Sequence, residues 1–265
     1  MQMCTIRPSS QIVFSLHEFF MCKIGTLDFE VCGGCVLNEK QNYILRKPCS
    51  SLHRPKCDES TIRSFIERLV KVYHKPIITI RFSDPFRDVF AIELIRLLNN
   101  GPLRNVKYDI CHSSPESYRT VFNEAATLDT LEIKLKRLLS FQSSPSVSLR
   151  LDHLQIRGSC HWIKLEDFMN CKSVTLNHFI KFDFKKIETE RLNSFFKKLK
   201  ESECRIEKFT YTVNSPVKMD RSIFSKIVEG LNDIHGSDSV EFIRRDQKKT
   251  RISWTEETLL MEPVY

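Results

Sequence analysis

The chain has 265 residues, a formal net charge of +8 and 41% hydrophobic residues, which is enough for a sizeable core. No apolar run approaches the roughly 20 residues of a membrane helix, and no N-terminal apolar segment predicts a signal peptide, so we expect an intracellular protein, cytoplasmic or nuclear. With only seven glycines and no glycine-rich phosphate loop or nucleophile elbow, the sequence argues against the common enzyme classes, and we expect no catalytic residues and no cofactor.

Residues 1–57 differ in pattern from the rest of the chain. Short apolar runs such as QIVFSL and TLDFEV lack helical spacing, which is typical of strands joined in hairpins. Gly33 and Gly34 suit a two-residue hairpin turn, and Pro48 and Pro55 mark the passage into the next region. We therefore predict an N-terminal β-hairpin cap over 1–57 and a repeat region over 58–265.

The repeat region alternates helical and extended patterns. Over 192–199 the apolar residues fall at i, i+3, i+4 and i+7, which predicts a helix, and over 209–213 they alternate, which predicts a strand. Similar helical stripes occur at 62–70, 90–98, 118–122, 162–171 and 223–231. The predicted strands are 77–82, 105–111, 130–135, 153–158, 173–178, 206–213 and 239–245.

Markers of these strands recur every 20 to 35 residues. A helix–strand unit of that length cannot bury its apolar stripe alone, so neighbouring units stack. The fold prediction is α/β: a degenerate leucine-rich-repeat-like solenoid of about seven units with a largely parallel sheet and the N-terminal hairpin cap. A compact α/β domain without repeats is the alternative.

Four segments of the C-terminal half carry a family resemblance. They are HWIKLEDFMNC with Trp162, ERLNSFFKKL, IEKFTYTV and the closing RRDQKKTRIS hairpin. Over about 150–255 the chain resembles the F-box-associated domain (type 2) of nematode F-box proteins. The resemblance implies a non-enzymatic protein-interaction module: the substrate-recognition part of a receptor for an SCF-type ubiquitin ligase.

That family usually begins with an F-box of about forty residues, which docks the ligase adaptor. Residues 1–45 show neither the leucine–proline opening nor the helical stripes of an F-box. The F-box is either lost, or the chain is a truncated product. The resemblance therefore implies an unknown target protein as partner, and it leaves the link to the ligase adaptor in doubt.

Two alternatives come from other motifs. Cys32, Cys35, Cys49 and Cys57 have the spacing C-x2-C-x13-C-x7-C, which is near that of a zinc ribbon, although CGGC suits a hairpin turn better. The basic stretches FKKLK and RRDQKKTR, with a pI near 8.9, allow a nucleic-acid-binding protein. Their phenylalanines have core spacing, so a solvated basic face is the favoured interpretation.

The strands predict a candidate partner-binding surface, because alternate residues point away from the core. The inward residues are Ile78, Ile80, Val106, Leu131, Ile133, Leu154, Ile156, Val174, Leu176, Phe209 and Tyr211. The outward residues are Thr79, Arg81, Lys107, Asp109, Glu132, Lys134, Gln155, Arg157, Thr175, Asn177, Thr210 and Thr212. A face that mixes both charges with hydroxyl and amide groups suits a polar protein partner. The solvated side of an ordinary sheet is the alternative.

Overall fold

The structure is a computed structural model, and it describes most of the chain from residue 59 onward. The described residues are 11–16, 20–24, 27–32, 35–38, 59–72, 76–84, 86–110, 113–135, 148–160, 163–179, 187–214, 219–231, 234–235 and 238–265. For the strands before residue 39, and for residues 72, 179, 187, 234 and 235, only the backbone is described. The chain divides into an N-terminal unit, Met1–Leu128, and a C-terminal unit, Asp129–Tyr265.

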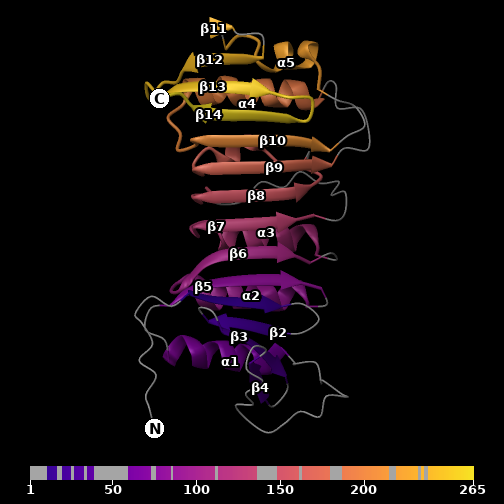
Figure 1. Ribbon diagram of the computed structural model, residues 1–265, viewed down its shortest axis with the longest axis vertical. Coiled ribbons are helices and arrows are strands. Elements are labelled where there is room, and N and C mark those ends of the chain that lie inside the picture. Colours follow the sequence, from indigo (N-terminus) through magenta and orange to yellow (C-terminus); the bar gives the residue numbers. More distant parts are fainter. Residues whose placement is uncertain are drawn as a thin grey trace. The chain divides into compact units, whose positions relative to one another are not determined.

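The N-terminal unit combines antiparallel and parallel strands (Figure 1). Its strands are β1 (Gln11–Leu16), β2 (Phe20–Ile24), β3 (Leu27–Cys32), β4 (Cys35–Asn38), β5 (Ile77–Ser83) and β6 (Leu103–Asp109). Its helices are α1 (Glu59–Val72), α2 (Asp88–Asn99) and α3 (Pro115–Glu124). Strands β1 to β4 pair in antiparallel succession, whereas β1, β5 and β6 run parallel. Because β1 pairs with β5, the segment predicted as a cap and the first predicted repeat strand meet within one unit.

Ion pairs join consecutive helices of this unit at intervals of 28 or 30 residues. Arg87, which precedes α2, pairs with Glu59 of α1, and Arg96 of α2 pairs with Glu124 of α3 at 2.7 Å. Each pair is separated by 28 residues. Solvent screens exposed pairs of this kind, so they align the helices more than they stabilise them.

The C-terminal unit places four parallel strands beside an antiparallel meander (Figure 1). Its strands are β7 (Thr130–Lys134), β8 (His153–Gly158), β9 (Ser173–Phe179), β10 (Lys208–Asn214), β11 (Ile234–His235), β12 (Ser239–Ile243), β13 (Lys249–Trp254) and β14 (Thr258–Pro263). Helices α4 (Ile187–Glu201) and α5 (Arg221–Ile227) and the 3-10 turn η1 (Leu165–Phe168) complete it. Strands β7, β8, β9 and β10 pair parallel in sequence order, and β14 then pairs antiparallel with β10.

The prediction for the strand around Val240 was wrong in one respect. We expected it to be a strand of the largely parallel repeat and also part of the closing hairpin; β12 runs antiparallel to both β11 and β13, so the hairpin is confirmed but the parallel orientation is not. The reason is the length of the connection: only residues 244–248 lie between β12 and β13, and a parallel crossover needs a dozen or more. The helical stripe predicted at 162–171 is also shorter than expected, because only the four residues of η1 are helical.

The predicted apolar stripe of α4 forms the centre of the core of this unit. Leu192, Phe195, Phe196 and Leu199 are fully buried. The rings of Phe195 and Phe196 lie 4.9 and 5.7 Å from the ring of Phe209 on β10. The stripe therefore packs on the inward face of the parallel strands, so the outward residues of those strands point to the opposite side.

Candidate interaction surface

The parallel strands of both units have one buried apolar face and one outward polar face. All eleven side chains predicted to face inward are buried. Of the predicted outward residues, Arg81, Lys134 and Arg157 are exposed, and the others except Thr79 are partly exposed. The alternation predicted from the sequence therefore describes both faces correctly apart from one residue.

That residue is Thr79, which is only 5% exposed and cannot serve as a contact for a partner in this conformation. Its hydroxyl accepts a hydrogen bond at 3.0 Å from the side-chain amide of Asn105. Asn105 is the residue opposite Thr79 on β6. The side chain of the neighbouring strand covers the hydroxyl, and strand alternation alone does not predict such coverage.

In the N-terminal unit the remaining candidate residues lie in two cross-strand pairs. Arg81 is directly opposite Lys107, and Asp109 is directly opposite Ser83. Within the described residues, the guanidinium of Arg81 forms no ion pair with a carboxylate. Two basic side chains are therefore adjacent on the outward side of β5 and β6, an arrangement that costs stability when nothing compensates it.

In the C-terminal unit the strand register aligns the outward residues in three rows. The first row is Thr130, His153, Ser173 and Lys208. The second row is Glu132, Gln155, Thr175, Thr210 and Leu260. The third row is Lys134, Arg157, Asn177, Thr212 and Thr258. The eight candidate residues of this unit thus form two adjacent rows, and β14 extends both.

The extension onto β12, β13 and β14 was missed in the sequence. Thr258, Leu260 and Glu262 face outward on β14, because Leu259 and Met261 between them are fully buried. The signal is present in TLLMEP, where alternating residues are apolar over one strand length. The outward surface of this unit is therefore wider than the four parallel strands.

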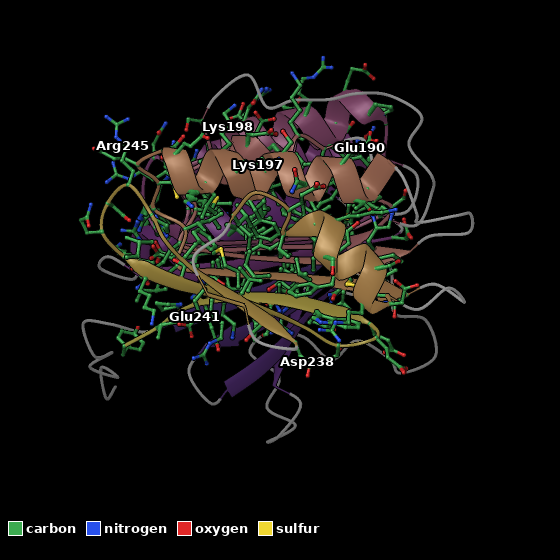
Figure 2. All side chains as sticks on the ribbon, turned by 90° about the horizontal axis from the view of Figure 1, so that it is seen from above. Glu190, Lys197, Lys198, Asp238, Glu241 and Arg245 are labelled. Carbon is green, nitrogen blue, oxygen red and sulfur yellow. The ribbon has the colours of Figure 1, made fainter. Side chains whose placement is uncertain are left out.

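Glu241 links the outward sides of β12 and β13. Its carboxylate lies 2.6 Å from a guanidinium nitrogen of Arg251 and 2.7 Å from the ammonium of Lys249. Hydrogen bonds from Lys249 and Arg251 lower the pKa of Glu241 below its ordinary value. Figure 2 shows Glu241 on the side of the strands away from α4, which carries Lys197 and Lys198.

Most basic side chains of the motif RRDQKKTR form ion pairs within the protein. Arg244 is buried, and both Arg244 and Lys248 pair with Asp246. Lys249 and Arg251 share Glu241, as described above. Only Arg245 of this motif is exposed without an ion pair to a described residue. Because these basic side chains are paired within the protein, the motif offers few free charges for binding a nucleic acid.

A buried polar network joins the start of α4 to the segment after β8 and to the middle of β10. Nη1 of Arg191 donates to both carboxylate oxygens of Glu188, at 3.0 and 2.9 Å, and Nη2 donates to the backbone carbonyls of Cys160 and Ile163. Glu188 accepts a further hydrogen bond from the hydroxyl of Tyr211 at 3.0 Å. Burial, followed by the charge of Glu188, raises the pKa of Tyr211, so the phenol stays protonated.

Further along α4, two polar side chains hold the end of α5. The amide of Asn193 donates to the carbonyls of Ile227 and Glu229, each at 2.9 Å. The ammonium of Lys200 donates to the carbonyl of Leu231 at 3.0 Å. These carbonyls lie at or just after the C-terminus of α5, where a helix lacks intrahelical donors. Arg191 and Asn193, two of the polar residues of ERLNSFFKKL, therefore have identifiable structural roles.

The described cysteines of the C-terminal unit do not resemble catalytic thiols. Burial raises the pKa of Cys160 to about 12 and that of Cys171 to about 11, which disfavours the nucleophilic thiolate. Burial also raises the pKa of Cys204. The zinc alternative lies largely outside the described residues, because Cys49 and Cys57 are not described and Cys32 and Cys35 have backbone only.

Packing is the role to expect for Trp254 and Trp162, because both side chains are large and apolar. Trp254 stacks on Phe224 of α5 with ring centroids 5.5 Å apart, which agrees with that role. Trp162 lies outside the described residues.

The fold and the surface together define an α/β protein with an outward polar face. Comparison with protein-family models, with curated proteins and with solved structures gave no match to this chain. Among the described helices, none is long and apolar enough to cross a membrane.

Proposed function

We propose that the chain is a protein-interaction module that binds a polar partner protein on the outward face of its strands. The observation that carries the proposal is the arrangement of outward residues in adjacent rows. On the C-terminal unit, cationic, hydroxyl and amide groups from five neighbouring strands lie side by side. Mixed donors and acceptors on a broad sheet surface favour selective contact with a protein over a small molecule, which binds in a concave pocket.

The family resemblance supports a specific role for this module. The segments that carry it, around Arg191 and Arg244, belong to networks that tie helices and loops to the strands. They are features of a scaffold, and a scaffold that presents a polar face suits target recognition. We propose that this role is the substrate recognition of an SCF-type ubiquitin ligase receptor.

We also propose that the helix–strand units form a degenerate solenoid that the N-terminal antiparallel strands cap. Support comes from the sequence-order pairing of β7, β8, β9 and β10 and from the ion pairs between consecutive helices of the N-terminal unit. Deletion of residues 1–57 should then leave β5 without its partner β1. Because an unpaired strand edge promotes association, we expect the shortened chain to self-associate, as measured by light scattering. A shortened chain that stays monomeric and folded contradicts the cap.

The surface is tested by reversing its basic charges together. We expect the variant Arg81→Glu, Lys107→Glu, Lys134→Glu, Arg157→Glu to lose partners that the unchanged chain captures from cell extract, as measured by co-purification and mass spectrometry. Each side chain is at least partly exposed, so circular dichroism and the thermal midpoint should change little. Recovery of a ligase adaptor with the wild-type chain would show the ligase role directly.

The matched control reverses charge on the helical side of the C-terminal unit. Lys197 and Lys198 on α4 are exposed and lie across the strands from Glu241 (Figure 2). The variant Lys197→Glu, Lys198→Glu should capture the same partners as the wild-type chain. Equal capture by the four-residue variant would place the binding surface elsewhere. Capture of nucleic acid, lost steeply between low and physiological salt, would favour the nucleic-acid alternative.

A further inference from the structure

A histidine with a buried side chain lies near the carboxyl end of β9. His178 is only 3% exposed, and it is opposite Gly158 of β8 and Val213 of β10 in the strand register. Its side chain points inward, because Leu176 two positions earlier is buried and Asn177 between them faces outward. Histidine is the side chain that ordinarily changes charge between pH 5 and 8, so a buried one is a candidate for a pH-sensitive contact.

The hydrogen bond that this ring accepts defines its protonation state. Nδ1 of His178 accepts a hydrogen bond from the backbone N–H of Cys160 at 2.9 Å. A ring nitrogen accepts only when it carries no proton, so the imidazole is neutral and its proton is on Nε2. A second proton would occupy Nδ1, and the buried N–H of Cys160 would then lose its acceptor and face another donor.

Contacts of Cys160 connect the histidine to the start of α4. The backbone carbonyl of Cys160 accepts from Nη2 of Arg191 at 3.0 Å, and Nη1 of Arg191 donates to Glu188 in the first turn of α4. Glu188 also accepts from the hydroxyl of Tyr211, whose ring stacks on that of His178 with centroids 5.8 Å apart. These five residues form a closed ring of contacts, which we call the latch.

The other members of the latch give a protonated histidine little compensation. Among the described residues, the titratable or charged groups that reach the imidazole directly or through one neighbour are Cys160, Tyr211, Glu188 and Arg191. Burial raises the pKa of Cys160 to about 12 and also raises the pKa of Tyr211, so neither supplies a negative charge. Glu188 already accepts three hydrogen bonds from Arg191 and Tyr211. A proton on His178 would therefore add a second cation to a buried network that already contains Arg191.

We propose that His178 makes the latch acid-sensitive, so that acidification releases the start of α4 and the segment after β8 from the carboxyl ends of β9 and β10. The ordinary pKa of a histidine is about 6.5. As the pH falls below that value, an opened chain binds a proton that the closed latch excludes, and opening becomes more favourable. For one such group the equilibrium constant for closing falls by up to tenfold per pH unit. This inference does not rest on the proposed function.

Urea unfolding of the full chain, followed by circular dichroism at pH 7.5 and pH 5.5, tests the latch. The variants are His178→Phe, which keeps a ring against Tyr211 but removes the acceptor, and His178→Asn, which keeps an acceptor for Cys160 but removes the ring. Neither replacement can titrate. We expect the folding equilibrium constant of the wild-type chain to fall more than that of either variant between these two pH values, by a factor of up to about ten.

The control for this test is a histidine on the neighbouring strand. His153 on β8 is exposed, so water solvates its charged form in the folded and the unfolded chain alike. His153→Asn should therefore keep the acid sensitivity of the wild-type chain. The inference is overturned if the wild-type chain and both His178 variants lose stability equally on acidification, or if His153→Asn alone removes the acid sensitivity.

Hydrogen exchange of the wild-type chain decides the question even if neither His178 variant folds. After correction for the intrinsic effect of pH on exchange, peptides that contain Cys160 or the first turn of α4 should be less protected at pH 5.5 than at pH 7.5. Peptides from β13 and β14 should keep their protection. Unchanged protection around Cys160, or an equal loss in every peptide, contradicts a local latch.

Discussion

Replacing Gly158 by alanine should destabilise the protein by about 3 kcal/mol or more, since strain and overlap add. Gly158 ends β8 with a φ of +129°, a conformation that residues with a Cβ rarely adopt. A Cβ at this position would overlap the carbonyl oxygen of Leu135 and lie 2.6 Å from the Cβ of Leu135. Neither group can move easily, because Leu135 is buried and its backbone amide donates a hydrogen bond to the backbone carbonyl of Arg157 at 2.7 Å.

The matched control is Gly101→Ala, in the turn after α2. The nearest atom to a Cβ there is the carbonyl oxygen of Leu98 at 3.9 Å, and the backbone is outside the left-handed region. Its effect should lie within about 1 kcal/mol, and it can be stabilising because alanine restricts the unfolded chain. Both variants are compared by urea unfolding followed by circular dichroism. A Gly158→Ala variant as stable as the Gly101→Ala variant would contradict the close packing of β7 against the end of β8.

The role of Gly158 shows where prediction from this sequence ends. The strand 153–158 was predicted with the bounds that the structure has, because its alternation is local. The φ of its last residue depends on Leu135, which is 23 positions away along the chain. Nothing in the pattern of HLQIRG indicates that contact.

The same distinction explains the candidate surface. Alternation of side chains is a local property of strands, so the inward set and most of the outward set could be assigned without a structure. Which outward residues are adjacent depends on strand order and register, which are not local. Alternation within single strands therefore predicts neither that β14 extends the outward surface beside β10 nor that the side chain of Asn105 bonds to the hydroxyl of Thr79.

Charge in the sequence was the least reliable guide to function. RRDQKKTR reads as a basic patch, yet Arg244 is buried and three more of its basic residues pair with Asp246 or Glu241. The carboxylate of Glu241 comes from the preceding strand, and only the hairpin register of β12 and β13 brings it to Arg251. The cations of Arg157 and Lys134, which are 23 positions apart in the sequence, lie next to each other because β7 and β8 pair.

Arg244 is therefore a residue of the scaffold, and its replacement by methionine gives the second large effect. Only 2% of its side chain is exposed. One guanidinium nitrogen donates to the carbonyl of Ile206 at 2.5 Å, and the other donates to the carbonyl of Cys204 at 2.6 Å and to Asp246 at 3.0 Å. These bonds hold the connection between α4 and β10 against the turn of the β12–β13 hairpin.

Methionine fills a similar apolar volume but donates no hydrogen bond, so the carbonyls of Cys204 and Ile206 and the carboxylate of Asp246 would lose their donor. Removing one partner of a buried charged pair costs about 3 to 5 kcal/mol. The lower end is expected here, because Asp246 keeps its pair with Lys248 and the Nε of Arg244 already lacks a partner in the described structure. We expect about 3 kcal/mol in the free energy of unfolding.

The neighbouring arginine supplies the control. Arg245→Met removes the same charge one position along the chain, where the side chain is exposed. The substitution keeps the backbone amide of residue 245, which donates to the backbone carbonyl of Lys200 at 2.9 Å. Its effect should stay within about 0.5 kcal/mol, as for most surface substitutions. Urea unfolding of the two variants decides the point: if Arg245→Met costs as much as Arg244→Met, the charge of the motif matters and the buried contacts of Arg244 do not.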